Sequence, residues 1–314
     1  MRETESWKRR SFPPAPMTTA ADRTDGATLA VLTALAVLWA QLYWACSYAW
    51  LAGDYYDYGW YVPPLAAWFF VRRWRDQGGR GPGIQARGAT VAALLLLPAL
   101  VVVRVLGQVD PNWRLPILAE ACLVAATTIW ILARSKGWAA LPAFVPVLLF
   151  ALSAVPYPTV VEQGLVRTLT RWVVQVASEG FNLWGRPTQA VGDRLASLGV
   201  VVEVTEGCSG IRSLQSFLMA GLFFGELHRL AVPRRIVLMA GACLLALVVN
   251  AARAMTLAAI RFDHGEEAFA NAHDWVGLAA FVASALSFLV LSGLLARRRF
   301  ATRRRVLGAA SPGP

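Results

Sequence analysis

The chain has 314 residues, of which 57% are hydrophobic, with 13 Trp residues and a mean hydropathy of +0.49. It is too apolar for an ordinary soluble protein of this length, so a soluble class is excluded. The net charge of +11 does not indicate nucleic-acid binding, because the basic residues lie in short segments between or beyond apolar runs. Membrane proteins distribute their Arg and Lys in this way.

Several apolar runs approach or exceed the roughly 18 to 20 residues that cross a bilayer as a helix. We therefore predict an all-α membrane protein with about eight transmembrane helices. In chain order these cover residues 27–51, 58–71, 88–108, 114–133, 138–155, 209–227, 235–260 and 275–296. Together they form one membrane domain, 27–296, between an N-terminal tail (1–26) and a basic C-terminal tail (297–314).

The longest segment between two predicted spans is 156–207, which precedes the sixth span. Apolar residues recur at helical spacing from 161 to 184, which predicts an amphipathic helix lying at the membrane interface. The valine-rich stretch 193–204 predicts a short strand or hairpin. We expect a short extracytoplasmic α/β insertion that delivers the chain to Glu206 and Cys208 and covers the outer mouth of the bundle.

The basic residues predict the orientation in the membrane. Most of the 30 Lys and Arg residues lie in segments 2–23, 72–87, 134–136, 229–235 and 297–305. Alternating spans place all five segments on one side, which the positive-inside rule identifies as the cytoplasm. We predict a multi-pass protein of the cell (inner or plasma) membrane with both termini cytoplasmic.

The four cysteines are far apart and show no CxxC spacing, so a metal site or a dithiol redox site is poorly supported. Cys46, Cys122 and Cys243 lie inside apolar runs, where a thiol usually packs as a small hydrophobic group. Cys208 alone lies at a polar boundary, just before the sixth span.

Three reactive or charged residues converge on the outer side of the predicted bundle. Cys208 and His273 each precede a span at its outer end, and His273 lies in the loop that we predict between 260 and 275. Arg253 lies 18 residues beyond Arg235 in the seventh span, or about 27 Å from the cytoplasmic side. Charged groups at membrane depth are costly and usually functional, so we predict a shared extracytoplasmic site.

The residue types fit cysteine-based acyl transfer. A thiol attacks as the thiolate, which a helix N-terminus or a nearby cation favours, so Cys208 is the candidate nucleophile. His273 can exchange protons near neutral pH, and Arg253 can stabilise an oxyanion. Asn250 lies on the same helical face as Arg253 and is expected to orient it.

Three segments of this sequence resemble the signature regions of the exosortase/archaeosortase family. They are EGCSG (206–210), NAAR (250–253) and HDWVGLAAF (273–281), in the same order and at similar spacing. The last contains the HxxxGxxxF pattern as His273, Gly277 and Phe281. A weaker similarity covers YYDYGWYVPPLAAWFFVRRWRD (55–76), and the resemblance extends over residues 27–296.

This resemblance implies a membrane-embedded cysteine protease or transpeptidase without a cofactor or metal. Its expected partners are the lipid bilayer and membrane-anchored protein substrates, which carry a C-terminal tail of short motif, transmembrane helix and basic cluster. Cleavage near the motif, on the outer face, would be followed by transfer to an acceptor or release. By position, Cys208 is the nucleophile, Arg253 the oxyanion or substrate-orienting group and His273 the acid–base residue, with Glu206 and Asn250 as supporting residues.

Other classes remain open. A non-enzymatic transporter, flippase or scaffold of an export or polysaccharide system would fit the hydropathy, but these spans show no clear internal repeat or paired acidic residues. A membrane thiol oxidase is disfavoured by the absence of paired cysteines. Hydrolysis and transpeptidation use the same residues and differ only in the acceptor. The sequence does not identify the sorting motif, the acceptor, the subfamily or the oligomeric state.

Overall fold

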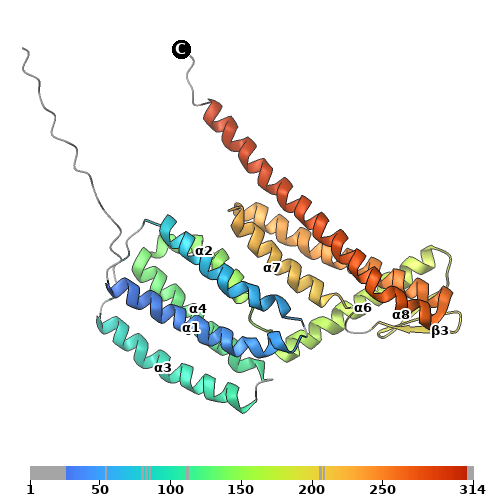
Figure 1. The fold of residues 1–314 in the computed structure, drawn as a ribbon, viewed down its shortest axis with the longest axis horizontal. Helices are drawn as coiled ribbons and strands as arrows, with labels where there is room; N and C mark the ends of the chain where they lie inside the picture. Colours follow the sequence, from blue (N-terminus) through green and yellow to red (C-terminus); the bar gives the residue numbers. More distant parts are fainter. Residues whose placement is uncertain are drawn as a thin grey trace, which may run out of the picture.

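The computed structural model describes residues 26–309, except 54, 79, 80, 82, 83, 85, 111, 112, 205, 206 and 208. The predicted N-terminal tail therefore lies almost wholly outside the described residues. The described part is mostly helical (Figure 1). Its α-helices are α1 (Gly26–Leu51), α2 (Val62–Asp76), α3 (Ala86–Val109), α4 (Arg114–Lys136), α5 (Leu141–Leu152), α6 (Thr159–Leu183), α7 (Ile211–Leu227) and α8 (Val232–Ala309).

Three helices of the described part are long and apolar enough to cross a membrane: Leu29–Leu51, Arg114–Lys136 and Val232–Arg297. Leu94–Val109 and Trp138–Leu152 are apolar but shorter. The structure thus confirms a mostly helical protein with helices that could cross a membrane, while the number of crossings stays a prediction. The proline pair in the second predicted span lies in the first turn of α2, where the missing N–H groups have no intrahelical acceptor to lose.

The largest apolar core lies between α1, α2, α4, α5 and α7. Leu42, Phe69 and Phe150 are fully buried in it. Tryptophan and tyrosine side chains add hydrogen bonds to this packing, since Trp50 donates to the carbonyl of Ala154 at 2.9 Å. Such bonds between helices satisfy carbonyl groups that have no water nearby.

Helix α8 is a pair of helices joined at one residue. Gly265 has φ +83° and ψ −170°, a conformation open mainly to glycine, and it separates 232–264 from 266–309. The two arms pack along each other, since Leu291 lies against Gly241 (Figure 1). We had expected a loop between 260 and 275. That expectation was wrong, because the helices continue beyond the apolar runs and reverse at Gly265 alone.

The segment 156–207 contains the predicted amphipathic helix and a small antiparallel sheet. The strands β1 (Gln189–Val191), β2 (Arg194–Ser197) and β3 (Val200–Glu203) follow α6 and are joined by two-residue turns. The buried face of the sheet packs through Leu195 and Val202 on α6 and α8. The α/β content of this segment is confirmed, and its extracytoplasmic position stays a prediction.

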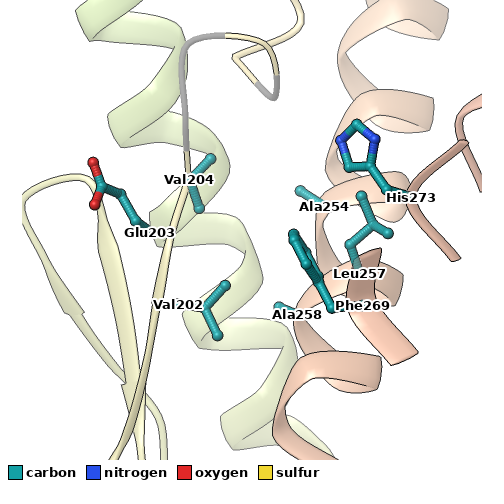
Figure 2. Close-up of a pocket in the computed structure, with 8 residues that line it drawn as sticks. All are labelled: Val202, Glu203, Val204, Ala254, Leu257, Ala258, Phe269 and His273. Atoms are coloured by element: carbon teal, nitrogen blue, oxygen red, sulfur yellow. The ribbon is translucent and has the colours of Figure 1, made fainter. Parts of the chain in front are cut away.

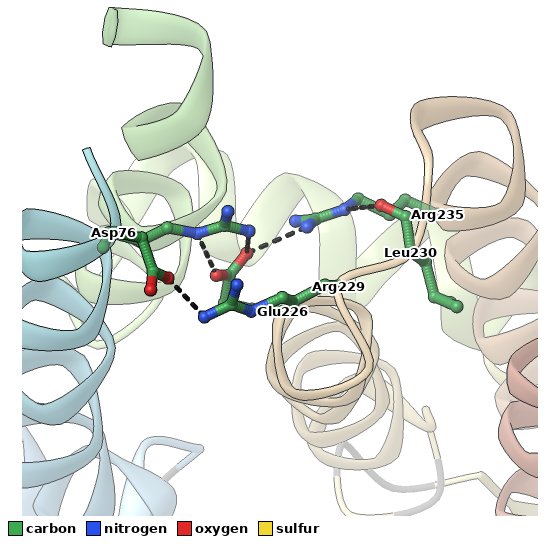
Figure 3. Close-up of polar contacts among 6 residues, drawn as sticks. Asp76, Glu226, Arg229, Leu230 and Arg235 are labelled. Carbon is green, nitrogen blue, oxygen red and sulfur yellow. Dashed lines mark hydrogen bonds and ion pairs between the residues drawn. The ribbon is translucent and has the colours of Figure 1, made fainter. Parts of the chain in front are cut away.

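One end of the bundle is held by a cluster around Glu226, at the end of α7 (Figure 3). This carboxylate is 1% exposed and pairs with Arg73 at 2.5 Å and with Arg235 at 2.9 Å. Arg229 pairs with Asp76 beside it. The cluster therefore joins three segments that the sequence predicts to be cytoplasmic loops or their borders, on α2, α7 and α8.

The opposite end is held by a cluster around Tyr56. Its hydroxyl donates to Glu162 of α6 at 2.6 Å and accepts from the backbone N–H of Tyr157 at 2.9 Å. Arg114 pairs with Glu162 at 2.5 Å. Burial, followed by the bond to Glu162, raises the pKa of Tyr56 well above its usual range. The cluster fixes α6 to the bundle.

Candidate active site

Arg253 and His273 meet where the two arms of α8 lie side by side. The guanidinium Nη2 lies 3.3 Å from His273 Nε2, and Nη1 lies 3.4 Å from the carbonyl oxygen of Gly207. Gly277, one turn beyond His273, lies beside the guanidinium: a Cβ there would be 3.7 Å from Arg253 Nε, an ordinary contact distance. The predicted convergence of Arg253 and His273 on one site is thus visible in the structure.

The contact bears on the tautomer of His273. A guanidinium only donates hydrogen bonds, so in this contact Nε2 would accept from Arg253 and the proton of a neutral ring would lie on Nδ1. Nδ1 lies 3.4 Å from the carboxylate of Asp274, which can accept that proton's hydrogen bond. The side chain is 41% exposed. His273 lies within a helix, and not in the predicted loop before the eighth span.

Arg253 retains one unused donor. Its Nε is buried and has no hydrogen-bond partner among the described residues. An unpaired buried donor is unfavourable unless another group completes it. The site therefore holds a fixed cation with capacity for a further acceptor.

Two glycines and a serine shape the chain around the predicted nucleophile. Ser209 is fully buried, and its hydroxyl accepts from the N–H of Ile211 at 3.4 Å. Gly210 begins α7 with φ +84°. A Cβ on Gly210 would lie 2.6 Å from the Asn250 amide nitrogen, so this close approach requires glycine. Asn250, predicted to orient Arg253, is buried against this turn.

Cys208 and Glu206 lie outside the described residues. Their neighbour Gly207 contacts Arg253, and Ser209 lies at the start of α7. The structure thus brings together Arg253, His273 and the segment that carries Cys208. It does not describe the cysteine side chain itself, so the nucleophile stays a prediction.

An apolar pocket of about 220 Å³ opens beside His273 (Figure 2). Ala254, Leu257, Ala258 and Phe269 of α8 form one wall with His273. The other wall is β3, with Val202, Glu203 and Val204. The Glu203 carboxylate is turned away from α8, so the main chain of this residue faces the pocket (Figure 2).

The sequence reasoning did not identify this pocket or the Tyr56 cluster. Phe269 belongs to the stretch that was expected to be a loop, and Glu203 was noted only as part of a strand. Ala258 lies on the first arm of α8, and Phe269 and His273 lie on the second. That they line one pocket follows from the reversal at Gly265, which the sequence did not predict. Among the described residues, no group of three His, Cys, Asp or Glu side chains has the arrangement of a metal site.

Comparison with known protein families matches residues 50–304 to the transmembrane exosortases. No curated protein and no solved structure matches the chain. The matched region contains α2 to α7, most of α8 and all the predicted site residues. It spans well over half of the 314 residues. The chain therefore belongs to the transmembrane exosortase family.

Proposed function

We propose that this protein is a membrane cysteine transpeptidase that cleaves the C-terminal sorting signals of exported proteins. The observation that carries the proposal is the contact of Arg253 with both His273 and Gly207, the residue before Cys208. A cation, an imidazole and a cysteine-bearing segment are the groups that acyl transfer requires. Family membership supports the same reaction class.

In the proposed reaction, Arg253 donates to the oxygen of the scissile carbonyl instead of to His273 Nε2. Nε2 then takes the proton of the Cys208 thiol, and the sulfur attacks the carbonyl carbon. Arg253 stabilises the resulting oxyanion with the donors that it has available. Collapse of the intermediate breaks the C–N bond, and His273 returns the proton to the leaving amine. The product is a thioester on Cys208 and a released C-terminal helix.

Release completes the cycle. An acceptor amine attacks the thioester in transpeptidation, and water attacks it in hydrolysis, with His273 taking the proton in both cases. Glu206 and Asn250 would support the cysteine segment. Asn250 is suited to this, because its side chain lies against Gly210 at the start of α7.

The placement of charge supports an extracytoplasmic site. The Glu226 cluster gathers predicted cytoplasmic segments at the end of α7, whereas Gly207 and Arg253 lie at its beginning. The 17 residues of α7 span about 26 Å, close to the hydrocarbon thickness. The site would therefore open on the outer face. We also propose that the membrane domain extends over 27–296.

The test uses a tagged reporter with a randomised short segment, an apolar helix of about 20 residues and a cluster of arginines at its C-terminus. We expect shortening of a subset of reporters by the wild-type protein, and none by Cys208→Ala or Cys208→Ser at equal levels of folded protein. Normal shortening by either variant would contradict the assignment of Cys208. A protein that binds reporters without shortening them would fit the scaffold alternative instead.

A further inference from the structure

We propose that the free edge of β3 binds the substrate segment as an added strand, with one apolar substrate side chain in the pocket beside His273. The occupant is an extended peptide immediately before the scissile bond of a membrane-anchored protein. The inference rests on the proposed function and names how the same site holds its substrate.

The first support is the hydrogen-bonding pattern of the sheet. Among the residues that the structure describes, the strand order is β1-β2-β3, so β3 is an edge strand. Val200 pairs with Ser197 across a two-residue turn, and Val204 donates to the carbonyl of Asp193. Because antiparallel pairs alternate, Val200, Val202 and Val204 bond to β2, while the N–H and C=O of Val201 and Glu203 face the free edge.

The second support is the place of this edge. Helix α6 contacts β1 and β2, whereas α8 contacts β3. The pocket lies between β3 and α8, and the main chain of Glu203 lines it (Figure 2). Unpaired strand edges with adjacent pockets are a common binding mode for extended peptides, in which backbone bonds give affinity and alternate side chains give selectivity.

The third support is continuity with the reacting groups. His273 lines the pocket and contacts Arg253, which in turn contacts Gly207, four residues beyond Glu203. A peptide bound along β3 therefore runs toward the guanidinium that would hold its scissile carbonyl. The walls supplied by Leu257, Ala258 and Phe269 favour an apolar side chain at the position bound beside His273.

The backbone is tested by proline substitution, which removes one N–H. Glu203→Pro and Val201→Pro delete outward N–H groups, and an edge strand tolerates proline there. We expect about a tenfold lower rate of reporter shortening, the effect of one lost hydrogen bond. The matched control is Ala190→Pro, which deletes the outward N–H of β1 at the opposite edge.

Photo-crosslinking tests the same surface without requiring cleavage of the reporter. A benzoylphenylalanine replaces Val201 or, as the control, Ala190, both exposed, in the Cys208→Ala protein. We expect the tagged reporter library to be captured from position 201 and not from 190. Capture at neither position, or equally at both, would overturn the strand-docking proposal.

The two proposals fail separately. Capture at 201 by a protein that shortens no reporter when Cys208 is intact would keep the docking site and contradict the transpeptidase. Shortening of reporters without capture at 201 would keep the transpeptidase and contradict the docking site. Pocket selectivity gives a further check: Phe269→Ala should extend the captured and shortened reporters to larger apolar residues at one position, and an unchanged selection would contradict the pocket assignment.

Discussion

At the scale of the residue, Arg253 connects the parts of the site. One guanidinium reaches His273 on the second arm of α8 and Gly207 before α7, with Nε still available among the described residues. A planar group with donors in fixed directions can do this, and a lysine ammonium on a flexible stem does so poorly.

Replacing Arg253 by Lys should therefore reduce the rate of reporter shortening by about 100-fold, the usual cost of losing an oxyanion donor. The fold should persist, which size-exclusion elution in detergent would verify. Arg261→Lys is the matched control, because Arg261 lies on the same arm and pairs with the exposed Glu266. A wild-type rate for Arg253→Lys would remove Arg253 from the reaction.

Gly210 provides a second residue-scale prediction. Gly210→Ala places a methyl group 2.6 Å from the Asn250 amide at a positive φ, so the segment carrying Cys208 must shift. We expect at least a tenfold loss of shortening with a lowered unfolding temperature. Gly164→Ala in α6 has open space for its methyl group and should leave shortening unchanged without lowering the unfolding temperature. Equal behaviour of the two variants would contradict the structural role of this turn.

At the scale of the element, the sequence predicted an amphipathic helix at 161–184 and a strand or hairpin at 193–204, because amphipathic spacing and β-branched runs are local signals. The structure has the helix at Thr159–Leu183 and three strands between Gln189 and Glu203. It did not predict that 261–274 is helical. That stretch is polar and contains Gly265, features of a loop, but both helices continue up to the reversal at Gly265, where Phe262 packs against the core formed by α6 and the sheet. Tertiary packing of this kind cannot be read from local pattern.

The Glu226 cluster makes an element-scale prediction about stability. Glu226→Gln leaves Arg73 and Arg235 partly buried without their counter-charge, which should lower the free energy of unfolding by about 3 kcal/mol. Glu266→Gln, which breaks an exposed pair with Arg261, should cost less than about 1 kcal/mol. Denaturation in detergent measures both, and similar losses would show that the cluster does not hold α2, α7 and α8 together.

At the scale of the whole molecule, the two polar clusters lie at opposite ends of the bundle, with the candidate site at the Tyr56 end. The sequence predicted the outward convergence of Arg253 and His273 from helix length and charge alone. It could not predict the pocket, because its walls come from residues more than 50 positions apart in the chain, such as Val202 and Ala258. The Glu226 and Tyr56 clusters could not be predicted from the sequence either, since each joins several distant segments.

The predicted orientation can be tested by labelling from outside the cell. In a background without the native cysteines, Gly185→Cys and Leu198→Cys should react with an impermeant maleimide in intact cells. Gly78→Cys and Ala231→Cys, at exposed positions of the Glu226 end, should react only after permeabilisation. The reverse pattern would place the candidate site on the cytoplasmic face and contradict the positive-inside assignment.

The acyl-enzyme itself is the most direct test of the account. Purified protein is mixed with an intact reporter of a sequence that the wild-type protein is found to shorten. The mixture is quenched in acid, digested with a protease and analysed by mass spectrometry. The account predicts a hydroxylamine-sensitive adduct on Cys208 with the mass of the reporter segment upstream of the cleaved bond, and its absence from Cys208→Ala. Reporter cleavage by Cys208→Ala, or an adduct on another residue, would contradict it.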